Sequence, residues 1–513
     1  MTATRQLVTV CVLSSIMTVS LSAADRDTLS VSSRILSNTS KAHRFMTLQY
    51  DNPAMNWFHY DHSLTELEAG GIFSDEEIPY QVEKGDGVRG LGFKASSYSR
   101  IDRNNVVWGE ASYYNGRRRN VTWNENSDYD KIGPYVMADS LKGDIDFEHY
   151  LFDGGYARAI GRWTLGAEFR YRASLEYRKI DPRPRNLSAE ISADAGASVL
   201  LGPVRLGLSA TAGRYRQNST ISYYNELGLN KTFQLTGLGS SYLRFDGARN
   251  AADYEGYSYG GSFSTSYVPA NKALGGITAS ISYLGGYINK RLPDLNDLDL
   301  TRSDDSQILA EIGWMRDLSG HTIGAKAVAK TLTRKGTENI FGDAAGNEYR
   351  KLTSAQVYRK TDTEYGVTAL YEGFSKRDDR INATAGLLFR GLNEKQHSSG
   401  SHMSIENINI DASASYAAVR GRNSFEAGIA GTYTVGTGQS LTLGKVTAPF
   451  ADRITRQNFR VQSSDAVSAA VAARWGYQIH RIILYIGGDC RLTVYSGTKS
   501  KSTMVAMRVG IAL

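Results

Sequence analysis

The chain is poor in cysteine, in proline and in long apolar runs. It has 513 residues, of which 2 are cysteine and 9 are proline. Cys11 falls in the N-terminal leader described below, so Cys490 stands alone in the rest of the chain and cannot form an internal disulfide. Beyond residue 24 no stretch of about 18 apolar residues occurs, which excludes a protein that crosses a membrane with helices.

The chain also lacks a long block of one charge. Its 59 Lys and Arg residues face 52 Asp and Glu residues, for a formal net charge of +7. The longest basic run is Arg117-Arg118-Arg119, and elsewhere both signs alternate. A nucleic-acid-binding protein concentrates its basic residues in a stripe or patch. The sequence therefore predicts no nucleic-acid partner.

Residues 1–24 have the features of a secretory signal peptide. Arg5 supplies a positive charge, residues 7–19 are mostly apolar, and Ser22-Ala23-Ala24 provides the small residues of a cleavage site. We expect an exported chain that begins at Asp25.

Glycine and tyrosine are abundant, with 51 and 31 residues, and much of the chain alternates apolar with polar residues. In residues 163–178 the odd positions are apolar or aromatic, while the even positions carry five charges. A strand that crosses a bilayer needs about 9–11 residues, apolar toward lipid and polar toward the lumen. The sequence thus predicts an all-β protein, a single transmembrane antiparallel β-barrel over residues 63–513.

The lengths of the connections also favour a transmembrane β-barrel. Links of a few residues alternate with long polar ones, such as 115–148 and 215–256, as in barrels with short periplasmic turns and long external loops. The pattern predicts about 18 strands, or 16 if the first hairpin packs elsewhere. One of these strands is expected over residues 458–475.

The charged positions of two neighbouring predicted strands would line the lumen. These predicted lumen-lining residues are Glu168, Arg170, Arg172, Glu176, Arg178, Glu190 and Asp194.

Residues 25–62 lack sustained alternation but contain apolar and aromatic side chains that would not sit free in the periplasm. We predict that this segment lies in the lumen as a hatch; a periplasmic tail or a contact at the rim is the alternative. The predicted hatch residues are Phe45, Asn52, Pro53, Trp57, Phe58 and Tyr60.

The 215–256 loop is rich in tyrosine and arginine, the residues enriched in binding hot spots. It is predicted to face a partner or ligand, with a loop folded over the pore as the alternative. The residues concerned are Tyr223, Tyr224, Tyr242, Arg244 and Tyr254.

Neither metal nor enzyme chemistry is predicted. His59 and His62 have H-x-x-H spacing, but a bare pair outside a helix is a weak metal signal. No G-x-S-x-G nucleophile motif stands in a strand-turn-helix context. We expect no cofactor and no catalytic residues.

Four features carry a resemblance to a known type of protein: the leader, Asp51-Asn52-Pro53-Ala54 with Met55-Asn56-Trp57, the hairpin 63–99 and the alternating terminal strand. Together they resemble a Bacteroidota-type outer-membrane β-barrel of an uncharacterised family of about this length. Asn52-Pro53-Ala54 is also similar to the pre-barrel segment of long-chain fatty-acid outer-membrane transporters, in which an N-terminal stretch forms a luminal hatch. Leu513 departs from the pattern, since the terminal residue of such barrels is more commonly aromatic.

The resemblance implies a barrel in the cell outer membrane, in contact with its lipids, that mediates or assists nutrient uptake. The alternative is a non-transporting subunit of a surface assembly, partnered with a TonB-dependent transporter or surface lipoproteins.

Overall fold

The computed structural model describes residues 30–225, 231–247, 250–267, 276–346, 348–445 and 451–513. The predicted signal peptide lies outside these residues. Among them, no helix is long and apolar enough to cross a membrane.

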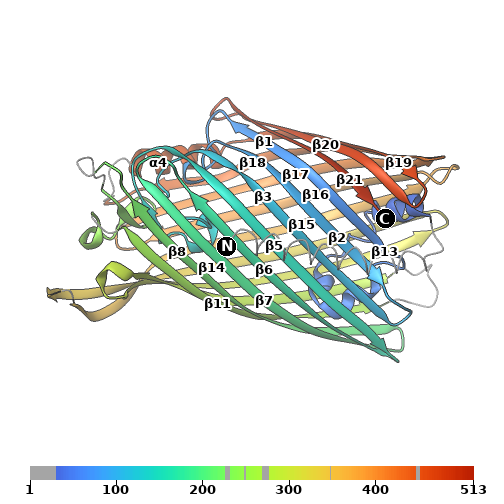
Figure 1. Cartoon of the computed structure of the whole chain (residues 1–513), viewed down its shortest axis with the longest axis horizontal. Coiled ribbons are helices and arrows are strands. Elements are labelled where there is room, and N and C mark those ends of the chain that lie inside the picture. The colour runs from blue at the N-terminus through green and yellow to red at the C-terminus, as the bar shows by residue number, and fades with distance from the viewer. Residues whose placement is uncertain (1–29, 226–230, 248–249, 268–275, 347, 446–450) are drawn as a thin grey trace.

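Eighteen strands of the described residues form one closed antiparallel β-barrel (Figure 1). Successive barrel strands pair with each other, and β1 closes the ring by pairing with β21, from Glu66 opposite Ala512 to Glu76 opposite Ser502. The predicted all-β barrel and its strand number are confirmed. The barrel strands are β1 Leu64–Glu76, β2 Gly87–Arg100, β3 Asn105–Val121, β5 Gly143–Ile160, β6 Trp163–Tyr177, β7 Arg183–Leu201, β8 Val204–Ser222, β11 Ala251–Tyr267, β12 Gly276–Leu292, β13 Leu298–Leu318, β14 His321–Ala345, β15 Glu348–Phe374, β16 Arg380–Gln396, β17 Ser401–Arg420, β18 Asn423–Thr442, β19 Ala466–Ile479, β20 Ile482–Tyr495 and β21 Ser500–Ala512.

The period-2 pattern gives the barrel two faces. On β6, Trp163, Leu165 and Phe169 point outward and are 46–48% exposed, while Thr164 between them is 4% exposed. Outward-facing Leu, Ile, Val, Tyr and Phe side chains recur at the same spacing around the ring. Because such a large apolar surface is costly in water, it marks a face that needs lipid or another partner.

The two rims of the barrel differ. At one, β5 and β6 are joined by Gly161 and Arg162 alone, and Gly161 has φ +58°, which glycine adopts without steric cost. We call this rim the short-turn end; the C-terminus lies here (Figure 1). The opposite rim, the long-loop end, carries the small sheet of β4 (Met137–Ala138), β9 (Phe233–Gly237) and β10 (Ser240–Ser241) and the elements η3 Val82–Lys84, α3 Tyr129–Ile132, η4 Leu243–Phe245, η6 Pro293–Leu295 and α4 Ala451–Gln462.

Two sequence predictions need correction. The strand expected over 458–475 begins only at Ala466, because residues 451–462 form helix α4, with Ile454, Asn458 and Val461 buried at helical spacing. The long loops are also shorter than expected: β8 continues to Ser222 and β11 starts at Ala251, since strands keep pairing beyond the apolar band.

Candidate functional site

The N-terminal segment, residues 30–62, lies against the inner wall at the short-turn end. It consists of α2 (Val31–Asn38), η1 (Leu48–Asp51) and η2 (Pro53–Phe58). α2 packs on inward side chains of β1 and β20, and η2 lies against β5, β6 and β7. The segment therefore extends across the lumen from one wall to the other.

Asn52 and Pro53 sit in a cradle of inward-facing glycines on β6 and β7. Asn52 is fully buried, and its Nδ2 donates to the carbonyl oxygens of Ala197 and Leu208, at 3.2 Å each. A Cβ atom at Gly166 would lie 2.5 Å from the Ala54 nitrogen, and one at Gly196 would overlap the Asn52 amide. Only a wall without side chains admits the segment this closely.

Two inward glutamates on the opposite wall hold the middle of the segment. Glu372 on β15 accepts hydrogen bonds from the Ser40 hydroxyl at 2.9 and 3.0 Å and from the Ala42 nitrogen at 3.3 Å. Glu311 on β13 accepts one from the Leu48 nitrogen at 3.1 Å. Phe45, 5% exposed, packs with Leu370 and Met315 beside these contacts.

The aromatic residues after Pro53 meet arginines at the rim. The Arg100 guanidinium lies 4.9 Å from the Trp57 ring centroid, and that of Arg205 lies 3.4 Å from the Phe58 ring centroid. Tyr60 is 8% exposed and stacks on His59 with centroids 4.2 Å apart. The predicted hatch residues thus all contact the inner wall, its rim or each other.

The predicted lumen-lining residues near the segment form a paired charge array. Arg170 lies 2.6 Å from Glu168 and 3.9 Å from Asp194, and Glu168 also accepts from the Trp108 indole at 3.1 Å. Asp51 of the N-terminal segment borders the same charges. Desolvation in the lumen raises the pKa of Asp51 to about 6, although the field of Arg170 lowers it.

At the long-loop end the lumen is filled by two inward-folded stretches, residues 122–142 and 231–247, which we call the loop cap. The predicted lumen-lining residue Arg172 binds Asp128 of the cap through two hydrogen bonds, at 2.7 and 2.9 Å. Lys131 of the cap pairs with Glu190, which also lies 3.2 Å from Arg172. From the far wall, Arg334 donates to the Asp130 carbonyl oxygen at 2.9 Å.

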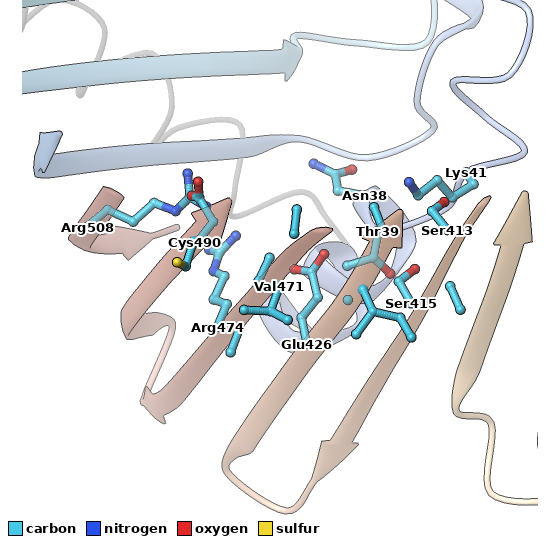
Figure 2. A pocket seen from close by; sticks show the side chains of 18 of the residues that line it. Asn38, Thr39, Lys41, Ser413, Ser415, Glu426, Val471, Arg474, Cys490 and Arg508 are labelled. Carbon is cyan, nitrogen blue, oxygen red and sulfur yellow. The ribbon is translucent and has the colours of Figure 1, made fainter. Parts of the chain in front are cut away.

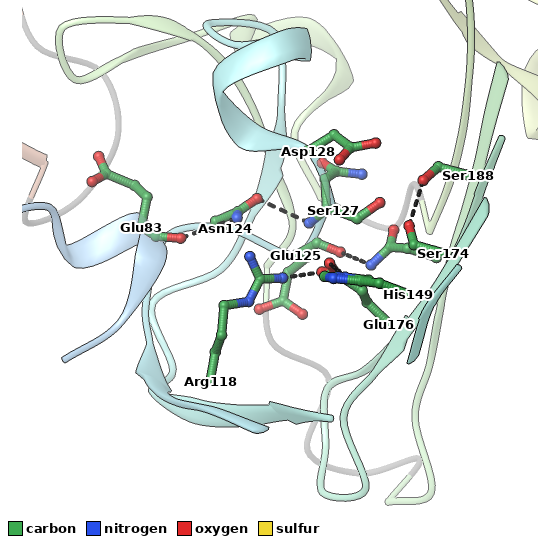
Figure 3. A network of polar contacts seen from close by, with 12 residues as sticks. Glu83, Arg118, Asn124, Glu125, Ser127, Asp128, His149, Ser174, Glu176 and Ser188 are labelled. Atoms are coloured by element: carbon green, nitrogen blue, oxygen red, sulfur yellow. Dashed lines mark hydrogen bonds and ion pairs between the residues drawn. The ribbon is translucent and has the colours of Figure 1, made fainter. Parts of the chain in front are cut away.

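The remaining two predicted lumen-lining residues, Glu176 and Arg178, contact residues at the edge of the cap. Glu176 is 3% exposed on its side chain and pairs with Arg118 and, at 2.9 Å, with His149 (Figure 3). Arg178 is almost fully buried, 3.0 Å from Glu125 and 4.0 Å from Asp139.

The cluster around Arg178 joins one guanidinium to two carboxylates without solvent. Burial raises the pKa of Glu125 well above its ordinary value, and the nearby Asp139 carboxylate raises it further. Buried ion pairs of this kind do not add much stability, but losing one partner is costly.

The tyrosines and arginine predicted to face a partner lie in different surroundings. Tyr254 belongs to β11, is 1% exposed and donates to the Tyr135 carbonyl oxygen at 2.9 Å. Tyr223 packs against the buried apolar cluster to which Tyr254 belongs. Tyr242 and Arg244 donate to carbonyl oxygens of β14, at Asn339 and Phe341. Tyr224 is 81% exposed.

Beside the two closures the lumen contains two cavities, along β14 to β21 and β1. A cavity of about 470 Å³ lies beside the N-terminal segment (Figure 2). In it Lys41 of the segment shares the space with Glu426 and with two ion pairs, Arg474 to Glu66 at 2.6 Å and Arg508 to Asp489 at 3.0 Å.

A second cavity of about 470 Å³ lies between the loop cap and β14 to β17, and its lining mixes apolar, aromatic and charged groups. β17 connects the two: Met403, Ile405 and Asn407 line the second cavity and Ser413 and Ser415 the first.

The inward positions between them, Asn409 and Asp411, are half-exposed and accept hydrogen bonds from Thr434 and Thr432, each at 2.7 Å. A polar strip therefore links the cavities.

Among the residues that the structure describes, no group of three or more His, Cys, Asp or Glu side chains could hold a metal ion. Sequence reasoning missed the groups that bind the closures. Glu311 and Glu372 occupy inward positions of alternating strands and could have been found by that parity. Asp128 lies in a stretch without periodicity, so no signal singled it out.

A family model matches residues 53–513, described as a family of unknown function, DUF6850. The chain belongs to this family. The match to the family model begins at Pro53 in the glycine cradle, so it includes η2 and the whole barrel. No curated protein matches the chain.

Several solved structures are similar at low identity. BauA, the ferric preacinetobactin receptor of Acinetobacter baumannii, has a TM-score of 0.43 and 9% identity, over 87% of this chain and 79% of that one. The FrpB iron transporter of Neisseria meningitidis (F3-3 variant) has a TM-score of 0.40 and 8% identity, over 90% and 82%. The outer-membrane transporter YddB of Escherichia coli has a TM-score of 0.38 and 6% identity, over 87% and 80%. These values carry no information about what this chain binds.

Proposed function

We propose that the protein is an outer-membrane β-barrel through which a polar solute passes, and that the N-terminal segment and the loop cap close this passage at its two ends. The outward apolar face supports the membrane location, because only lipid covers such a surface around a whole ring. The short-turn end would face the periplasm and the long-loop end the exterior.

The observation that carries the proposal is the polar strip of β17. An 18-stranded barrel is wide enough to leave an aqueous channel unless something occupies it. Here both closures contact several walls, yet a cavity remains beside each of them, and half-exposed polar groups of β17 continue from one cavity to the other. A barrel that served only as a scaffold would not need a polar, half-exposed strip between its two cavities.

The two closures act in series, so releasing either alone should leave the passage shut. Glu311→Ala with Glu372→Ala removes two carboxylate acceptors that bind the N-terminal segment. Arg172→Ala with Arg334→Ala removes two guanidinium donors that bind the loop cap.

Planar-bilayer conductance of wild type, each double variant and the combined fourfold variant tests the proposal. We expect large, steady conductance only from the fourfold variant. A matched control is Glu364→Ala with Arg390→Ala, lumen groups 3.8 Å apart whose ion pairs involve neither closure. A fourfold variant that folds, as shown by heat-modifiable gel mobility, and still fails to conduct would contradict the proposal.

A second candidate is a partner subunit of a surface assembly. β14 and β15 form a ribbon that projects beyond the barrel at the long-loop end (Figure 1). β13 pairs with β14 only as far as Glu338, and β16 pairs with β15 only from Tyr358. The base of the ribbon packs against the loop cap through Phe341, which is 6% exposed, but a two-stranded ribbon is only marginally stable by itself, and Leu352 on it is 62% exposed.

Replacing residues 342–350 with an Asn-Gly turn, which joins the cross-strand partners Phe341 and Lys351 and keeps the contact of Phe341 with the loop cap, tests this candidate. The barrel should still fold, and it should lose co-purification with a TonB-dependent transporter or surface lipoprotein from native membranes in mild detergent. Unchanged co-purification, or no such partner with the intact chain, would argue against a subunit role for the ribbon.

A further inference from the structure

A groove of about 820 Å³ lies on the outer face of the barrel, toward the long-loop end. It crosses β21, β1, β2, β3, β5 and β6, which are neighbours in the ring (Figure 1). It lies on the opposite side of the wall from the lumen, and none of the contacts that hold the two closures involves the side chains discussed below.

The strand register aligns the side chains of the groove in one row. Val505, Phe73, Arg89 and Arg117 are successive cross-strand partners, and Asp146 and Tyr177 continue the row. Directly opposed side chains on one face have Cβ atoms about 5 Å apart. The row therefore places two arginines side by side, next to an apolar stretch.

The charges of this row do not balance. Asp146 pairs with Arg117 at 2.5 Å and with Lys179 at 2.8 Å, and Asp144 lies 3.9 Å from Arg117. Arg89 packs over the Phe73 ring, 5.1 Å from its centroid, and forms no ion pair among the described residues. Arg117 and Lys179 thus have carboxylate partners, whereas Arg89 beside Arg117 has none among the described residues. Like charges directly opposed across strands are destabilising, so an anion bound beside Arg89 would stabilise the pair.

The next outward row begins with Met507, Gly71 and Leu91, again successive cross-strand partners, and continues into Asn115 on β3. Met507 is 69% and Leu91 71% exposed, and the Leu91 side chain leans over Gly71, where a Cβ atom would lie 2.9 Å from Leu91 Cδ2. Exposed apolar side chains therefore lead from the charged row into the lipid-facing band.

We propose that this groove binds a phosphorylated glycolipid of the surrounding leaflet. Its phosphate sits beside Arg89 and Arg117, and an acyl chain lies along the exposed side chains of Leu91 and Met507. Arginine suits the role, since its planar guanidinium presents paired donors to phosphate oxygens. The proposal rests on the outer-membrane location proposed above, but on neither closure and not on transport.

Native mass spectrometry of the full barrel in detergent, with added lipid, tests the proposal. The probe is lipid A, a bis-phosphorylated glucosamine lipid, and its dephosphorylated form is the lipid control. Arg89→Gln with Arg117→Gln removes the opposed pair. Retention should fall about 25-fold, because each basic residue near an anionic lipid surface contributes roughly fivefold. Lys376→Gln with Arg377→Gln, two exposed cations at the short-turn end, removes the same charge and should retain the lipid.

Three outcomes would overturn the proposal. Equal retention of the dephosphorylated lipid would leave no role for the phosphate. Equal loss of lipid retention in the Lys376→Gln, Arg377→Gln control would show that net charge alone explains the effect. Displacement of the lipid by millimolar inorganic phosphate would mean that the site takes free phosphate rather than a lipid. All variants must first show wild-type heat-modifiable mobility, and Leu91→Asn gives a second, charge-neutral variant that should also weaken retention. Membrane fractionation of the wild type tests location separately.

Discussion

The glycine cradle gives a direct test of how the N-terminal segment is held. Gly166→Ala with Gly196→Ala adds two methyl groups where the backbone of Pro53 and Ala54 and the amide of Asn52 now lie. At Gly166 the neighbour is backbone, and at Gly196 it is the Asn52 amide, which its two hydrogen bonds to the wall hold in place, so the segment must lift away. The wall itself is unharmed, because alanine is readily accommodated in a strand.

The free-energy cost of filling the cradle follows from the contacts that Asn52 loses. Its two hydrogen bonds to wall carbonyls contribute about 1 kcal/mol each. Overpacking of a close contact adds at least about 1 kcal/mol if the segment stays in place. A shift of about 2–2.7 kcal/mol toward release should raise the exposure of the segment about 30- to 100-fold.

Thiol labelling measures this release. Met55 is 3% exposed, so Met55→Cys in a Cys490→Ser background should react slowly in the parent and about 30- to 100-fold faster with the cradle filled. Gly154→Ala on β5 is the matched control, since a Cβ atom there meets nothing closer than the Trp108 carbonyl oxygen at 3.8 Å. Unchanged labelling in the cradle variant would refute the reasoning, as would equal acceleration in the control.

Three further predictions concern the outer face, pH and the cap. Leu165→Arg on the outward face should destabilise the barrel by about 2–4 kcal/mol in unfolding from lipid vesicles, whereas Arg170→Leu on the inner face should cost clearly less; similar losses would contradict the assigned faces. Burial, followed by the charges of Arg44 and His43, lowers the pKa of His59 to about 4, so the released segment binds the proton more readily and docking should weaken as pH falls from about 6.5 toward 4. The raised pKa of Asp51 acts in the opposite direction. In Asp51→Asn, Met55→Cys labelling, divided by the rate of a free thiol at the same pH because the thiolate is the reacting form, should therefore speed up as pH falls from about 7 to 5, and adding His59→Gln should abolish that rise. Arg178→Met leaves Glu125 and Asp139 buried without their cation and should lower the unfolding free energy in urea by about 3–5 kcal/mol at neutral pH, with a smaller loss in acid; no change would show that the cluster is not buried as described.

The barrel was predictable because its signal is local. The alternation of residues 163–178 fixes both the strand and the face of every side chain, and the same rule places Glu311 and Glu372 inward. Helix α4 was misread because its polar composition hides the spacing of Ile454, Asn458 and Val461, which only burial reveals.

The closures were harder to foresee, because their contacts are distant in sequence. Asp128 meets Arg172 44 positions away, and Ser40 meets Glu372 332 positions away. No periodicity marks either partner. The loop cap is built by residues 122–142 together with 231–247, so a prediction centred on the 215–256 loop could identify only half of it.

The measurement that tests passage through the lumen most directly uses β17 in the conducting fourfold variant, with Cys490→Ser. Asp411→Cys places a thiol on the polar strip between the two cavities, and Ala412→Cys places one on the outward face of the same strand. A bulky, membrane-impermeant thiol reagent should block the single-channel current of the Asp411→Cys protein and leave that of the Ala412→Cys protein unchanged. Current that persists after complete labelling of the Asp411→Cys protein, shown by mass, would mean that ions do not pass along this wall.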